Sequence, residues 1–116
     1  MNRFEPAAVF EKIRRRANAA VDAATVAAAS RALSDSNYFV RYHSGALMAS
    51  SLEHSLLHEG KLIWKTDYAV EVYYIGKPRT HVNPNASLMW AHKAADLYKD
   101  QWHAAARQAF RAYFER

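Results

Sequence analysis

The chain has 116 residues, of which 51% are hydrophobic and 23% charged, and its formal net charge is +5. This length and apolar content predict one globular domain, residues 1–116, and exclude a disordered chain. The absence of cysteine excludes disulfides and thiolate metal sites, and no apolar run approaches the roughly 20 residues that span a bilayer.

Residues 6–33 predict one long helix. The segment is rich in alanine, has no glycine or internal proline, and opens with Pro6, which suits a first helical turn. Val9, Ile13 and Ala17 begin an apolar stripe of three- and four-residue spacing that continues through further alanines. The small side chains of this stripe permit close approach of a neighbouring element but bury little area.

Residues 46–75 predict antiparallel strands. Gly45 provides a turn before them, because glycine accepts a positive φ, and Gly60 provides a second turn. Apolar residues between these glycines recur every four positions, which fits a helix face as well as one side of a strand. The resemblance described below favours a strand. Residues 68–75 are the clearest strand, since β-branched and aromatic side chains dominate them.

Residues 76–87 predict a loop. The segment holds two of the three prolines of the chain and is too long for a tight hairpin, which indicates a functional loop. It carries three basic or titratable side chains, Lys77, Arg79 and His81.

Residues 88–114 predict a second helix with an apolar stripe. Its aromatic side chains are more numerous than one helix needs for its own packing. We expect Trp90 and Trp102 to lie in the core, and Tyr113 with Phe114 to lie at a subunit interface.

The sequence contains no constellation for catalysis or for metal or cofactor binding. His54 and His58 are four residues apart, but Ser55 follows the first histidine where a zinc peptidase helix places glutamate, and no third ligand is identifiable. Ser44 lacks the glycine-flanked turn of a nucleophile and is more simply a turn residue. Three glycines provide no phosphate-binding loop. We therefore expect no enzymatic activity, no cofactor and no metal.

Short motifs follow one another in a particular order between residues 42 and 94. They are, in order, Tyr42, Gly45-Ala46-Leu47 with Ser50, Leu62-Ile63-Trp64, Thr66-Asp67-Tyr68-Ala69, Tyr73-Tyr74, Asn83-Pro84, and Trp90 to Ala94. This order resembles that of the minor capsid or head–tail joining proteins of tailed bacteriophages, a set of neck and tail-completion proteins.

The resemblance implies an α+β fold, with a small antiparallel β-sheet flanked by a long N-terminal helix and a C-terminal helix. It implies a structural virion protein that forms a homo-oligomeric ring, often a hexamer, in the neck that joins the DNA-filled head to the tail. The implied partners are portal, adaptor or stopper proteins and the tail tube or tail terminator. Because the chain opens with charged residues and no signal-peptide core, we expect assembly in the host cytoplasm without membrane contact.

Within such a ring, Lys77, Arg79 and His81 are expected to line a DNA channel, with non-specific contact to genomic DNA, or to contact a partner protein. The alternative is a small basic nucleic-acid-binding protein. Three consecutive arginines at residues 14–16 add charge, but consecutive residues point around a helix and do not form one patch. No motif for sequence-specific binding is present.

Overall fold

The computed structural model describes residues 5–115. The regular elements in this range are α1 (Pro6–Asn37), α2 (Ala46–His54), the short 3₁₀ helix η1 (Leu57–Glu59), α3 (Ala69–Tyr74) and α4 (Trp90–Phe114). The one β-type pairing among these residues is an isolated antiparallel bridge between Leu56 and Lys61. The predicted α+β fold, with antiparallel strands over residues 46–75, is therefore wrong, and the described chain is all-α.

The predicted strand at residues 68–75 is instead the short helix α3. Ala69 and Tyr73 lie on its inner side, four residues apart, whereas Val70 is 75% exposed. Trp90 packs edge-on against Tyr73 there, with ring centroids 4.5 Å apart. In a segment this short, the spacing of the apolar residues fits a helix as well as a strand. Burial of the inner side of α3 against Trp90 therefore outweighed the β propensity of its residues.

Residues 46–54 also form a helix where the sequence predicts a strand. Gly45 precedes it with a φ of +83°, and Leu47, Ser50 and Ser51 form its buried side. Each serine hydroxyl donates a hydrogen bond of 2.6 Å to the carbonyl three residues earlier. These local bonds satisfy the hydroxyl groups, so a helix can bury them.

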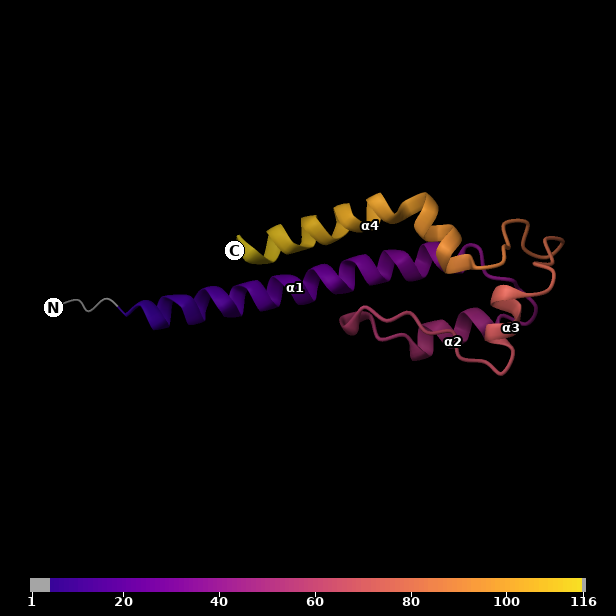
Figure 1. Cartoon of the computed structure of the whole chain (residues 1–116), viewed down its shortest axis with the longest axis horizontal. Coiled ribbons are helices and arrows are strands. Elements are labelled where there is room, and N and C mark those ends of the chain that lie inside the picture. Colours follow the sequence, from indigo (N-terminus) through magenta and orange to yellow (C-terminus); the bar gives the residue numbers. More distant parts are fainter. Residues whose placement is uncertain (1–4, 116) are drawn as a thin grey trace.

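The two long helices agree with the predicted ones and lie side by side in opposite directions (Figure 1). α1 continues four residues past its predicted end at residue 33. The indole N–H of Trp102 on α4 donates to a carboxylate oxygen of Asp35 on α1 at 2.7 Å. Arg31 donates to the amide oxygen of Gln101 at 3.3 Å, and the small Ala20 on α1 is fully buried.

The molecule is elongated, with extents of 74 × 26 × 18 Å and a radius of gyration of 19.2 Å, whereas a compact domain of this length has a radius of about 13 Å. At 1.5 Å per residue, α1 is about 48 Å long and α4 about 37 Å. α4 ends beside α1 well before the N-terminus of α1 is reached (Figure 1). The first part of α1 therefore projects alone, and every residue from 5 to 16 is exposed.

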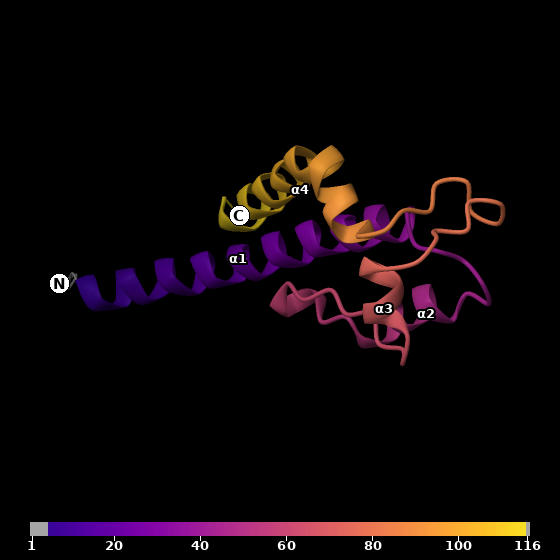
Figure 2. The same cartoon turned by 45° about the vertical axis from the view of Figure 1, so that its right-hand side comes forward.

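The core lies toward the other end of α1. α2 and η1 lie on the side of α1 opposite α4, and α3 lies near its C-terminal end (Figures 1 and 2). The buried cluster consists of Phe39, Val40, Leu47, Ala69, Trp90 and Ala94. Trp90 is 1% exposed, which confirms its predicted place in the core, and the partly buried Trp102 packs against the cluster.

Candidate functional site

The loop between α3 and α4 forms a basic cavity with the segment that follows α1. This cavity has a volume of about 730 Å³. It is lined by the loop residues that the sequence singles out, Lys77, Arg79 and His81, and by Pro78 and Thr80 between them. Arg41, from the segment after α1, lines the same cavity. The four residues Arg41, Lys77, Arg79 and His81 are referred to below as the basic tip.

The loop has an unusual backbone conformation at Arg79, and the side chain of Asn83 fastens it to the segment after α1. Arg79 adopts a φ of +57°, a left-handed conformation that is uncommon for residues other than glycine. The Nδ2 atom of Asn83 donates to the carbonyl of Val40 at 2.8 Å and to that of Tyr38 at 3.2 Å. Because Arg41 follows Val40 directly, these bonds keep Arg41 beside the loop.

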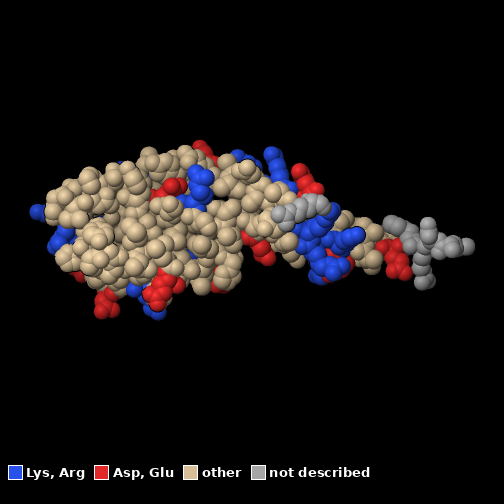
Figure 3. Space-filling view, turned by 180° about the vertical axis from the view of Figure 1, so that it is seen from behind, with Lys and Arg blue, Asp and Glu red and all other residues tan. Residues whose placement is uncertain are grey.

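No carboxylate within the described residues neutralises the basic tip. Arg41, Lys77 and Arg79 make neither an ion pair nor a side-chain hydrogen bond in residues 5–115. By contrast, Arg14 on α1 pairs with Glu11 at 2.7 Å. Figure 3 shows Lys and Arg side chains at both ends of the molecule, and those over the first part of α1 lie among acidic side chains.

Arg41 is the member of the basic tip that the sequence analysis misses. Its signal in the sequence is that residues 36–52 contain no aspartate, glutamate or lysine, so Arg41 is the one permanently charged side chain there. This signal alone does not identify a partner segment. The tertiary structure supplies the partner by placing residues 77–81 beside it.

A second surface is a groove of about 510 Å³ between α1 and the end of α4, referred to below as the α1/α4 groove. Its lining residues are mostly small and apolar: Ala19, Asp22, Ala23, Val26, Ala27, Ala109 and Tyr113. Of the two predicted interface residues, Tyr113 lines this groove. Phe114 stacks on Phe110 of its own helix, with ring centroids 5.4 Å apart.

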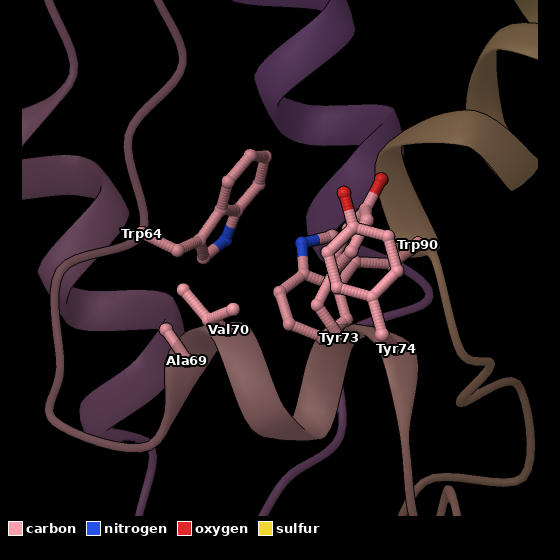
Figure 4. A pocket seen from close by; sticks show the side chains of 6 residues that line it. All are labelled: Trp64, Ala69, Val70, Tyr73, Tyr74 and Trp90. Carbon is pink, nitrogen blue, oxygen red and sulfur yellow. The ribbon is translucent and has the colours of Figure 1, made fainter.

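An aromatic pocket of about 210 Å³ lies over α3 (Figure 4). Its lining residues are Trp64, Ala69, Val70, Tyr73, Tyr74 and Trp90. Burial raises the pKa of the Tyr73 phenol, and the Tyr73 hydroxyl shares a hydrogen bond with Nδ1 of the exposed His92. The indole N–H of Trp90 is buried with no hydrogen-bond partner among the described residues. The lining of the pocket is mostly aromatic and apolar, so the pocket offers apolar contact.

The histidines do not assemble a metal site. Residues 5–115 contain no group of three or more side chains placed to hold a metal ion. His54 ends α2 and His58 lies on η1, so the two do not share one helix face. The Ser44 hydroxyl accepts the backbone N–H of Ala46 at 3.4 Å, as a turn residue does. None of the helices in this range combines the length and apolar character needed to cross a membrane.

Comparison with models of known protein families, with curated proteins and with solved structures finds no match for the chain. The basic tip, the α1/α4 groove, the projecting part of α1 and the order of the sequence motifs are therefore the basis for a functional proposal.

Proposed function

We propose that the protein is a structural subunit of a tailed-phage virion, which forms a ring in the neck and joins the DNA-filled head to the tail. The order of motifs between residues 42 and 94 supports the phage assignment. Most of these motifs contribute to the core: Leu47, Ala69, Trp90 and Ala94 are buried together, with Trp64 and Tyr73 packed against them. The motif residues thus serve packing, which suits a structural protein.

The observation that carries a role in assembly is the projecting part of α1. Phe10 is 68% exposed, and Val9 and Ile13 are nearly half exposed. A lone helical segment of about three turns is marginally stable in water. Fully burying one such apolar side chain contributes about 1.5–3 kcal/mol. A neighbouring subunit that covers these residues would therefore stabilise this part of α1.

A second copy of the chain is the occupant that the pattern on α1 favours. Ile13 lies seven residues before the buried Ala20, and residues seven apart share one side of a helix. Val9 lies four residues before Ile13, on the same side of the helix. The exposed stripe therefore continues the helix–helix interface that α4 already forms with α1, beyond the point where α4 ends.

The α1/α4 groove of the next copy is the complementary surface. Its alanines leave room for a bulky side chain such as Phe10. Asp22 in the groove has the charge that complements Arg15 on the projecting part of α1. A contact between two different surfaces of one chain is head-to-tail, and such contacts close into rings when the rotation between copies permits.

The test is electron microscopy of a lysate from a phage with an early stop codon in this gene. We expect DNA-filled heads and complete tails that lie unjoined, and joined particles when a plasmid supplies the wild-type protein. Joined particles in the absence of the protein would overturn the proposal, and the alternative of a free basic nucleic-acid-binding protein would then become the leading function.

A further inference from the structure

We infer that the basic tip is a binding site for the phosphodiester backbone of duplex DNA and that it does not read the base sequence. The inference rests on the proposed function for the choice of duplex, because a neck subunit surrounds the path of a double-stranded genome. Its physical basis is the positive charge of two segments, their convergence on one cavity, and the absence of side-chain partners for the cations within the described residues 5–115.

The two segments that meet at the basic tip carry positive charge and no carboxylate of their own. Residues 36–52 and 72–95 contain four basic residues, Arg41, Lys77, Arg79 and Lys93, and no aspartate or glutamate. The two segments therefore present cations without an acidic residue among them. A concentrated field of one sign attracts a polyanion, whereas interspersed charges do not.

The three permanently charged residues of the basic tip line one shared cavity and have no side-chain partner within residues 5–115. Arg41, Lys77 and Arg79 line the cavity of about 730 Å³, and no ion pair or hydrogen bond within residues 5–115 engages their side chains. The acidic residues nearest in sequence are Asp35, six residues before Arg41, and Glu71, six residues before Lys77, and neither forms an ion pair with these cations. The guanidinium groups therefore keep all their donors available for phosphate oxygens.

The form of the tip favours backbone contact over base readout. Its cations come from a loop and a connecting segment, and the adjacent helix α3 has only six residues. Base readout in the major groove needs an inserted helix or β-ribbon. Loop cations that touch only phosphates give weak, salt-dependent binding. Such binding permits the duplex to slide past the protein.

The experiment is fluorescence anisotropy of the purified full chain with a labelled 20-base-pair duplex, over a series of NaCl concentrations. Three phosphate contacts predict a slope of log affinity against log salt of about −2.7, with dissociation constants near or above about 1 μM. In the Arg41→Gln/Arg79→Gln variant we expect affinity to fall about tenfold or more at 50 mM NaCl and the slope to weaken by about 2.

The matched control is the Lys99→Gln/Arg107→Gln variant on α4, which removes the same charge and leaves the basic tip intact. We expect its affinity to change less than about threefold. Equal weakening by both variants, or no duplex binding by the wild-type chain, would overturn the inference. Preference for a single strand of the same length by tenfold or more would also overturn it, because exposed tyrosines near the tip would then be stacking on bases.

A complementation experiment separates this inference from the proposed function. A plasmid that supplies the Arg41→Gln/Arg79→Gln protein to the stop-codon phage should restore joined particles, since the tip is remote from the projecting part of α1. Loss of duplex binding together with restored particles supports both conclusions. Restored particles combined with unchanged duplex binding would overturn the DNA site and leave the neck proposal standing.

Discussion

The side-chain amide of Asn83 donates a hydrogen bond to the carbonyl oxygen of Val40, which lies 2.8 Å away in space and 43 residues away in the sequence. The backbone N–H of Ser87 adds a second link, to the carbonyl of Phe39 at 2.9 Å. Together these bonds fasten the loop after α3 to the segment after α1. They are the reason that Arg41 and Arg79 share one cavity.

Replacing Asn83 should therefore loosen the basic tip. We expect Asn83→Ala to lower the free energy of unfolding by about 1–3 kcal/mol, because two carbonyl groups lose their donor. Duplex binding should weaken as well. Urea unfolding measures the first effect and anisotropy the second. Asn85→Ala is the control, since no hydrogen bond of the Asn85 side chain occurs among residues 5–115. Equal losses in the two variants would contradict the role of Asn83.

The projecting part of α1 should matter for association and not for the stability of one subunit. We expect Val9→Ser/Ile13→Ser to shift the protein from oligomer to monomer in size-exclusion chromatography with light scattering, because the apolar stripe is lost. The unfolding midpoint of the monomer should change little. The control is Val70→Ser, at a residue that is also exposed but lies on α3. A monomeric wild-type chain at high concentration would contradict self-association through this surface.

The two glycines at Gly45 and Gly76 form a matched pair for a steric prediction. Both have positive φ, +83° and +95°, so alanine at either costs about 1–2 kcal/mol of backbone strain. A Cβ atom at Gly45 would also lie 3.2 Å from Cε2 of Tyr42, whereas one at Gly76 would meet no atom within 4 Å. We expect Gly45→Ala to be the more destabilising by about 1 kcal/mol in thermal unfolding. The reverse order would contradict the packing of Tyr42 on this turn.

Stability should fall in alkaline solution through Tyr73. Burial raises the pKa of this phenol in the folded protein, so the folded state holds its proton more tightly than the unfolded chain does. The stability that the protonated phenol contributes to the folded state is fully present below the ordinary tyrosine pKa of about 10. It is lost as the pH rises through the pKa of the folded protein. We expect Tyr73→Phe to flatten the decline in unfolding free energy above pH 10. Tyr74→Phe should flatten the decline less, because burial is the main cause of the raised pKa of Tyr73 and the neighbouring Tyr74 is a secondary one.

The long helices and the loop follow from local sequence. Residues 6–33 and 88–114 extend over many turns with helix-favouring residues and a repeating apolar stripe, so local propensity and burial agree over a long window. The prolines of residues 76–87 lack a backbone donor and interrupt regular structure. The burial of Trp90 also followed from its place on the second helix.

The tertiary structure alone decided the state of residues 46–75 and the composition of the basic tip. Segments of six to nine residues satisfy a helix and a strand equally well, and burial against Trp90 selected the helix at α3. Arg41 joined residues 77–81 because the amide of Asn83 reached the carbonyl of Val40 across the fold. Local sequence determines what repeats over many turns, whereas a contact between distant segments depends on how the whole chain packs.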